Sequence, residues 1–133
     1  MSYLFDSSAI LKAVMKNVIE TLPENYTIEL ARYELGNILW KEHALHRRIS
    51  DDEIKELIKL IKDTLKLMKI LKIECCEEII IDLAGKLGLT FYDASYVFYT
   101  RKMSLTLVTE DEKLMNKAKP HVKVLKLNSI IPR

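Results

Sequence analysis

Residues 3–15 read YLFDSSAILKAVM, and this stretch predicts the unit from which the rest of the fold is built. Its first three residues, Tyr3-Leu4-Phe5, form a short apolar run that ends at Asp6. From Ala9 onwards the apolar residues recur three or four positions apart, which is the period of a helix with one buried face. The stretch therefore predicts a buried strand followed at once by a helix.

The rest of the chain repeats this alternation of short apolar runs and helical patterns. Further strands are predicted at residues 26–30, 70–75, 105–108 and 122–127. Helices are predicted at residues 31–47, 50–68, 77–87 and 90–102, and again after Thr109. Strands that alternate with helices are typical of an α/β fold, in which a parallel sheet is covered by helices on both faces.

Size and composition are those of a globular protein. The length of 133 residues predicts a single domain over residues 1–133. The net charge of +2 does not by itself indicate a nucleic-acid partner. No apolar run approaches the ~18 residues of a membrane span, and no charged and apolar leader opens the chain. We therefore expect a cytoplasmic protein without membrane contact. The two cysteines, Cys75 and Cys76, are adjacent, which excludes a disulfide framework and a C-x-x-C metal knuckle.

Four acidic residues are predicted to lie near one edge of the sheet. Asp6 directly follows the first strand, Asp111 lies three residues beyond the fourth strand, and Asp93 lies in the first turn of the preceding helix. Glu34 flanks the apolar stripe of its helix, where a carboxylate needs a partner. Ligands of parallel sheets bind beyond the carboxyl ends of the strands, and a hard cation relieves repulsion between clustered acids. The four acids therefore predict a site for Mg²⁺ or Mn²⁺.

Each aspartate also has a purely structural explanation. A Thr-x-x-Glu capping box that begins at Thr109 would place Asp111 at the start of a helix. The equivalent pattern begins at Thr90 and ends at Asp93. Asp6, followed by two serines, can be a helix N-cap. Both roles remain compatible with the sequence.

Four segments of the chain, in this order, resemble PIN-domain ribonucleases, and most closely VapC-type toxins. They are residues 4–9 (LFDSSA), 33–41 (YELGNILWK), 87–94 (LGLTFYDA) and 107–111 (LVTED). The resemblance extends over nearly the whole chain. It implies a three-layer α/β/α fold with a five-stranded parallel sheet, and Mg²⁺- or Mn²⁺-dependent endoribonuclease activity on single-stranded RNA.

The resemblance also implies roles for individual residues. The acids of the family, both catalytic and metal-binding, match Asp6, Glu34, Asp93 and Asp111. Thr109, in the Thr-x-Asp pattern, would orient a ligand or water, and Asn37, one turn beyond Glu34, would support the site. A capping role for Thr109 and a solvated position for Asn37 fit the sequence equally well. Because VapC-type toxins pair with themselves and with an antitoxin, a homodimer and an inhibitory protein partner are expected.

A row of lysines is predicted on the helix at residues 50–68. An advance of about 100° per residue places five of them in one narrow sector: Lys55, Lys59, Lys62, Lys66 and Lys69. Such a face can bind an RNA backbone or can simply be solvated. Leu60 and Leu67 lie off the main apolar stripe of this helix. They predict either a second partner surface or cover by other helices of the domain.

Two other functions use parts of the same pattern. A phosphoacceptor signalling domain also needs acids, Mg²⁺ and a Lys-Pro pair such as Lys119-Pro120, but it requires an aspartate at the end of the third strand. Cys75-Cys76-Glu77 stand there instead. A PIN-like domain could also process RNA, or bind RNA or protein without cleaving. All four acids are present, so the sequence favours an active nuclease.

Overall fold

The computed structural model describes residues 2–132 and contains one parallel sheet. The predicted domain ends, residues 1 and 133, lie outside this range. The strands are β1 (Tyr3–Phe5), β2 (Tyr26–Ile28), β3 (Lys69–Leu71), β4 (Thr106–Val108) and β5 (Val124–Leu125). They pair in the order β3-β2-β1-β4-β5, and every pair is parallel. The predicted α/β class and five-stranded parallel sheet are confirmed.

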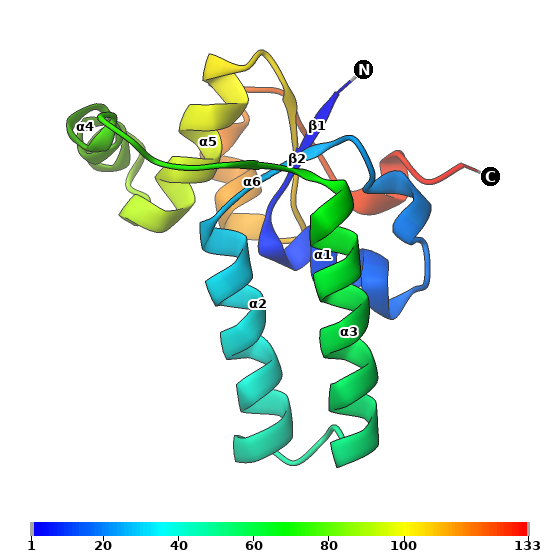
Figure 1. Ribbon diagram of the computed structural model, residues 1–133. Helices are drawn as coiled ribbons and strands as arrows, with labels where there is room; N and C mark the ends of the chain where they lie inside the picture. Colours follow the sequence, from blue (N-terminus) through cyan, green and yellow to red (C-terminus); the bar gives the residue numbers. More distant parts are fainter. Residues whose placement is uncertain (1, 133) are drawn as a thin grey trace.

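Helices cover both faces of this sheet (Figure 1). They are α1 (Ser7–Met15), α2 (Leu30–Trp40), α3 (Asp51–Leu67), α4 (Glu77–Leu87), α5 (Phe91–Lys102) and α6 (Glu112–Ala118), with short 3-10 turns at Ile19–Thr21 and Leu127–Ser129. Parallel crossovers are right-handed, so the connections from β1 out to β3 place α1, α2 and α3 on one face. The connections to β4 and β5 place α5 and α6 on the other. Accordingly, α1 packs on α2 and α3, whereas α4 packs on α5.

Helices α2 and α3 form an antiparallel pair that extends away from the sheet (Figure 1). After Trp40 the chain makes one π-helical turn, Lys41–Leu45, so the predicted helix at residues 31–47 ends in a different geometry. The capping box predicted at the start of α3 is confirmed. The Ser50 hydroxyl accepts from the backbone N–H of Glu53 (3.1 Å), and the Glu53 carboxylate accepts from the N–H of Ser50 (3.2 Å). Within residues 2–132, none of the helices has both the length and the apolar character to span a membrane.

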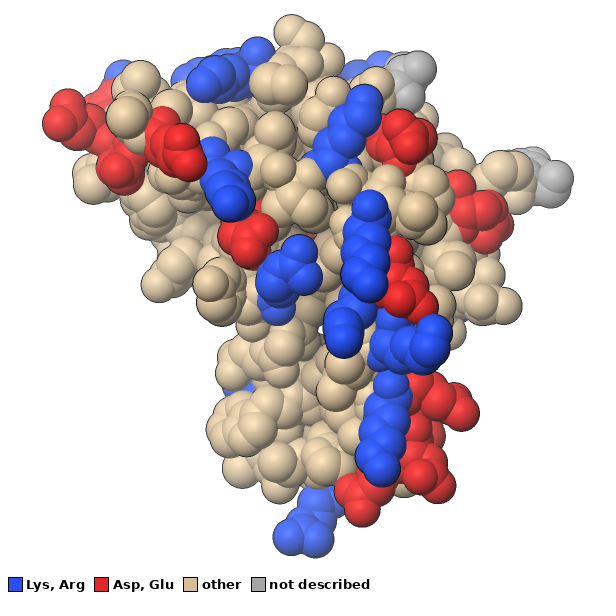
Figure 2. Space-filling view, viewed as in Figure 1, with Lys and Arg blue, Asp and Glu red and all other residues tan. Residues whose placement is uncertain are grey.

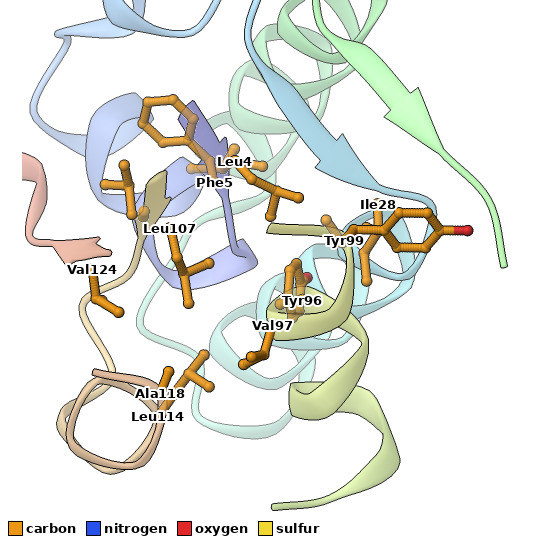
Figure 3. Packing of buried hydrophobic residues seen from close by; sticks show 14 of the residues in the cluster. Leu4, Phe5, Ile28, Tyr96, Val97, Tyr99, Leu107, Leu114, Ala118 and Val124 are labelled. Carbon is orange, nitrogen blue, oxygen red and sulfur yellow. The ribbon is translucent and has the colours of Figure 1, made fainter. Parts of the chain in front are cut away.

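The core lies between the central strands and the helix layers (Figure 3). Leu4 and Phe5 of β1 and Leu107 of β4 are completely buried, and Tyr96 and Val97 of α5 are buried on one side of these strands. A strand between two helix layers has no solvated face, so its residues are apolar without alternation. This explains why Leu4-Phe5 of β1 and Leu107-Val108 of β4 are adjacent apolar residues. Their carboxyl ends are therefore fixed by buried side chains.

The edge strands are shorter than predicted. β3 ends at Leu71 rather than residue 75, and β5 contains only Val124 and Leu125. Each pairs on one side alone, so fewer backbone hydrogen bonds hold its ends. Cys75 has a positive φ of 60°, which is incompatible with a continuing strand. Ile73 and Val122 still pack against the core, which explains their apolar character without strand geometry.

The lysine face of α3 contains four residues rather than five. Lys69 belongs to β3, where its Nζ lies 5.2 Å from the ring centroid of Tyr26, so the prediction that it shares the helix face is wrong. Of the two leucines off the main stripe, Leu60 packs against the core and Leu67 is 57% exposed. Figure 2 shows a column of basic side chains along α3. One open groove on this helix is bordered by Lys55, Lys59, Lys62 and Lys66.

Candidate active site

The four predicted acids come from elements on both sides of the point where the strand order reverses. β1 pairs with β2 on one side and with β4 on the other, so the crossovers leave these strands toward opposite faces. Such a reversal opens a crevice beyond the carboxyl ends of the strands. Asp6 follows β1 and Asp111 follows β4, while Glu34 and Asp93 project from α2 and α5. We call these four residues the acidic cluster.

Asp6 is the most deeply buried member of the acidic cluster, with 4% of its surface exposed. It is the N-cap of α1, and its Oδ1 accepts from the N–H of Ala9 (2.9 Å) and from the Ser8 hydroxyl (2.6 Å). Its Oδ2 accepts from the Thr109 hydroxyl. Burial raises the pKa of Asp6 from 3.8 to about 6 despite these hydrogen bonds, and Glu34 adds to the increase. The carboxylate is thus held in one orientation by three donors.

Thr109 connects Asp6 to Asp111. It is completely buried, and its hydroxyl donates to Asp6 and accepts from the N–H of Asp111 (3.0 Å). The predicted capping box at Thr109 is wrong, because α6 begins at Glu112 and Asp111 is its N-cap. The Oδ1 of Asp111 accepts from the N–H of Leu114 (3.1 Å). Asp111 is the most solvent-exposed acid of the cluster, and the cap occupies one of its two oxygens.

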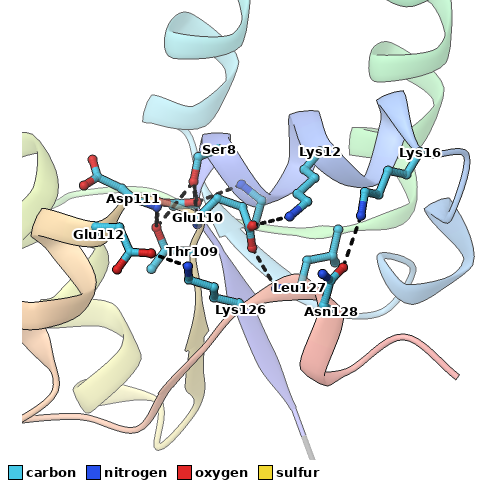
Figure 4. Close-up of polar contacts among 12 residues, drawn as sticks. Ser8, Lys12, Lys16, Thr109, Glu110, Asp111, Glu112, Lys126, Leu127 and Asn128 are labelled. Atoms are coloured by element: carbon cyan, nitrogen blue, oxygen red, sulfur yellow. Dashed lines mark hydrogen bonds and ion pairs between the residues drawn. The ribbon is translucent and has the colours of Figure 1, made fainter.

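A second set of contacts holds residues 109–111 against α1 (Figure 4). The Ser8 hydroxyl accepts from the N–H of Glu110 (2.9 Å). The carboxylate of Glu110 pairs with the Lys12 ammonium (2.5 Å) and accepts from the N–H of Leu127 (2.8 Å). Desolvation opposes ionisation of Glu110, but the Lys12 and Leu127 hydrogen bonds outweigh it and lower the pKa of this carboxyl. Glu110 is therefore neutralised by Lys12, which leaves Asp111 as the acid of this loop available to the cluster.

Glu34 has a buried partner that the sequence pattern did not indicate. Its Oε1 accepts from the Tyr96 hydroxyl of α5 (2.6 Å), and Tyr96 is 1% exposed. Burial and the neighbouring Glu34 raise the pKa of Tyr96, so this hydroxyl stays protonated and remains a donor. A signal was present in the sequence, since Tyr96 follows Asp93 by three residues and lies on the same helix face. Ser8, two residues after Asp6, was also missed.

Asp93 is electrostatically coupled to the other acids. It lies in the first turn of α5, where the Thr90 hydroxyl accepts from its N–H (3.1 Å), so Thr90 is the N-cap of α5 as predicted. The reciprocal bond predicted from the Thr90 N–H to the Asp93 carboxylate does not form, which leaves this carboxylate free for the cluster. Burial raises the pKa of Asp93, Asp111 and then Glu34 raise it further, and Lys113 opposes them. Glu34 acts in the same way on Asp6. Glu34 is thus electrostatically coupled to both Asp6 and Asp93, and Asp111 is coupled to Asp93.

The acidic cluster offers oxygen ligands to a hard divalent cation. Its donors are carboxylates, which Mg²⁺ and Mn²⁺ prefer. Among residues 2–132, no three Asp, Glu, His or Cys side chains already converge on one point where an ion could be held. The carboxylate oxygens of Asp6, Glu34 and Asp111 instead accept hydrogen bonds from neighbouring hydroxyl groups and backbone N–H groups. Mg²⁺ retains several waters and needs only one or two direct carboxylates, so an open arrangement of this kind fits it.

An open pocket of about 450 Å³ lies beside Glu34. It is lined by Leu30, Tyr33, Glu34, Asn37 and Tyr92. Four of these lie on one side of α2, because Tyr33 and Glu34 follow Leu30 by three and four residues and Asn37 follows Glu34 by three. Tyr92 comes from α5, directly before Asp93. Asn37, predicted to support the site, thus lines a pocket that shares Glu34 with the acidic cluster.

Two curated proteins from Pyrobaculum aerophilum are similar to this chain over most of its length. Exonuclease VapC9 is 34% identical over 126 residues, which cover 93% of this chain and 91% of that protein. Ribonuclease VapC3 is 31% identical over 128 residues, which cover 88% and 95%. The chain belongs to the VapC family. No protein-family model matches it.

Solved structures confirm the PIN-like fold of this VapC-family chain. The crystal structure of PAE2754 from Pyrobaculum aerophilum superposes with a TM-score of 0.82 at 28% identity, covering 98% of this chain and 93% of that one. A domain of a functionally unknown protein from Methanocaldococcus jannaschii matches with a TM-score of 0.50 at 22% identity, covering 95% and 90%, and shares the fold alone. The predicted resemblance to VapC-like PIN-domain proteins is therefore confirmed.

Proposed function

We propose that this VapC-family protein is a Mg²⁺- or Mn²⁺-dependent endoribonuclease that cleaves single-stranded RNA by attack of water. The observation that carries the proposal is the acidic cluster itself, in which Asp6, Glu34, Asp93 and Asp111 come from four separate segments. Glu34 raises the pKa of Asp6, and both Asp111 and Glu34 raise that of Asp93. The names of the two relatives, an exonuclease and a ribonuclease, support a nuclease. Carboxylates alone repel phosphate, so a cation is needed to reconcile this site with RNA.

Asp6, Glu34 and Asp93 would hold the ion directly. When bound, the ion would polarise the phosphodiester and lower the pKa of a water molecule. Asp6 is already oriented by Ser8 and Thr109, and Tyr96 orients Glu34 in the same way. Such supporting hydrogen bonds fix the direction of a ligand and tune its basicity. We propose that Asp111, exposed and engaged as an N-cap, acts through water rather than by direct contact with the ion.

The same proposal includes the biological role. As a VapC-family member, the protein is proposed to act in the cytoplasm as the toxin of a toxin–antitoxin pair, as a homodimer restrained by an antitoxin protein. Sedimentation of the purified protein at several concentrations would measure the dimer. A small antitoxin-like reading frame overlapping the gene would support the toxin role. An isolated gene would instead favour a role in RNA processing.

The test of the proposed function is cleavage of a circular single-stranded RNA, which an exonuclease cannot begin to degrade. The wild type is expected to open the circle with Mg²⁺ or Mn²⁺ and not with a chelator. Asp6→Asn and Asp93→Asn should lower the rate by about 100-fold or more, because each removes a charged ligand. Asp82→Asn is the matched control, since Asp82 is exposed on α4 and pairs with Lys86 (2.9 Å).

Two results would contradict the proposal. One is equal activity of the wild type and both cluster variants, and the other is no cleavage with any divalent ion. Shortening of linear RNA from one end while the circle stays intact would replace the endonuclease with an exonuclease, as the name of VapC9 suggests for that relative.

A further inference from the structure

The pocket beside Glu34 has two exposed aromatic rings on its wall. Tyr33 is 70% exposed and Tyr92 is 60% exposed, although both are large side chains. Each directly precedes an acid of the cluster, Glu34 on α2 and Asp93 on α5. The fold therefore places two solvent-facing rings next to the carboxylates from two different helices.

The lining of this pocket suits a neutral, planar ligand better than a phosphate. Its residues include Glu34 and no lysine or arginine, so a phosphate group would be repelled there. Leu30 and the two tyrosine rings offer apolar surface on which a flat ring can stack. The exposed amide of Asn37 can donate and accept hydrogen bonds at the edge of such a ring. An unpaired nucleobase is neutral and planar, and it carries hydrogen-bond donors and acceptors on its edge.

We propose that Tyr33, Tyr92 and Asn37 form a binding subsite for one unpaired nucleobase of an RNA strand whose backbone crosses the acidic cluster. The proposal rests on the proposed function and gives it a structural reason for a preference for single strands. In a duplex the bases are stacked on their neighbours and offer no free face to an aromatic side chain. The lysine face of α3 borders a different groove, so base and backbone contacts are separate.

The test measures binding without cleavage. Fluorescence anisotropy is recorded in Mg²⁺ with a short single-stranded RNA whose phosphorothioate linkages resist hydrolysis, and with copies that carry one abasic nucleotide at each position in turn. For the wild type, one abasic position should weaken binding about tenfold. Tyr33→Ala and Tyr92→Ala should each weaken binding of the intact RNA about tenfold and abolish the effect of that abasic position. Tyr33→Phe and Tyr92→Phe should bind normally because stacking requires the ring and not the hydroxyl.

The controls separate this subsite from a general surface effect. Ile81→Ala removes an exposed apolar side chain, 61% exposed on α4, and should leave binding unchanged. Thermal melts confirm that each variant is folded. The proposal is overturned if both alanine variants bind intact RNA as tightly as the wild type, or if the abasic penalty is the same in all proteins. If the alanine variants bind RNA normally but no longer bind an antitoxin protein, the proposal is overturned and the pocket recognises protein instead.

Failure of the subsite proposal can be distinguished from failure of the proposed nuclease activity. If the protein shows the expected effect of the abasic position but cleaves no RNA, the subsite is supported and the nuclease activity is contradicted. Metal-dependent RNA cleavage, together with unchanged RNA binding by both alanine variants, would support the nuclease activity and overturn the subsite.

Discussion

The Thr109 hydroxyl donates to Asp6 and accepts from the backbone N–H of Asp111 in a completely buried position. Thr109→Val keeps the shape of the side chain but removes both hydrogen bonds. We expect it to lower the free energy of unfolding by about 2 kcal/mol, because two polar groups lose a partner. RNA cleavage should fall as well, since Asp6 would lose its orientation. Thr109→Ser keeps the hydroxyl and should retain most of both properties. Urea denaturation and initial rates measure the two effects; a valine variant as stable and active as the wild type would refute the role of the hydroxyl.

Tyr96 and Tyr99 provide a matched pair of hydroxyl groups on α5. The Tyr96 hydroxyl donates to Glu34, whereas that of Tyr99 donates to the backbone carbonyl of Lys72, after β3. Tyr96→Phe should raise the Mg²⁺ concentration required for half-maximal cleavage by about tenfold, because it removes a hydrogen bond that orients a metal ligand. Tyr99→Phe should cost similar stability and leave the metal requirement unchanged. The same metal requirement in both variants would argue against a positioning role for Tyr96.

The sequence indicated the four acids and Thr109, but not the Ser8 and Tyr96 hydroxyl groups that also orient the acids. Asp6, Glu34, Asp93 and Asp111 could be placed because strand ends, helix starts and one unsatisfied helix position are local features. Tyr96 was missed because its contact with Glu34 depends on how α5 docks against α2. The predicted cap at Thr109 failed because a Thr-x-x-Glu pattern cannot distinguish a helix that begins at residue 110 from one that begins two residues later.

At the scale of elements, α3 presents a row of basic side chains beside the site-bearing helix α2 (Figure 2). Lys59 is paired with Asp63 (2.9 Å), which makes Lys62 and Lys66 the better test. If both contact phosphates, the double variant Lys62→Gln/Lys66→Gln should reduce the slope of log binding constant against log salt concentration by about 1.4, or ~0.7 per contact for a single strand. Lys86→Gln on α4 is the control. An unchanged slope would mean that this face is only solvated.

Helices and central strands could be predicted more closely than the edges of the sheet. The apolar runs of β1 and β4 have the predicted ends, residues 5 and 108, because burial on both faces leaves them no alternative. Ser50 marked the start of α3 through its cap. β3 and β5 were drawn too long, since apolar residues that pack beside an edge strand cannot be told from residues within it. The same reasoning placed Lys69 on the wrong element.

At the scale of the whole molecule, the buried carboxyl of Asp6 couples folding to pH. Its pKa rises from 3.8 to about 6 on folding, so its contribution to stability is full below about pH 4 and is lost as pH rises through 6. At neutral pH this shift lowers the free energy of unfolding by roughly 3 kcal/mol relative to its value below pH 4. Asp93, whose pKa burial also raises, acts in the same direction, whereas Glu110 acts oppositely because its pKa is lowered.

This coupling predicts how a metal ion changes stability. A bound Mg²⁺ needs ionised ligands and would remove the repulsion between them, so it should raise the melting temperature more at pH 8 than at pH 5. The melting temperature of Asp6→Asn should depend less on pH than that of the wild type when both are measured in a chelator. Calorimetric melting of the two proteins, with and without Mg²⁺, provides the comparison. An equal Mg²⁺ effect at both pH values would contradict the coupling.

Titration of the purified protein with Mn²⁺ in a calorimeter at pH 8 measures metal binding by the acidic cluster without RNA. The wild type and Asp82→Asn should bind Mn²⁺ with the same affinity, and Asp93→Asn should bind it at least about tenfold more weakly. Absence of Mn²⁺ binding by the wild type, or equal binding by Asp93→Asn and Asp82→Asn, would contradict the assignment of the acidic cluster as a metal centre.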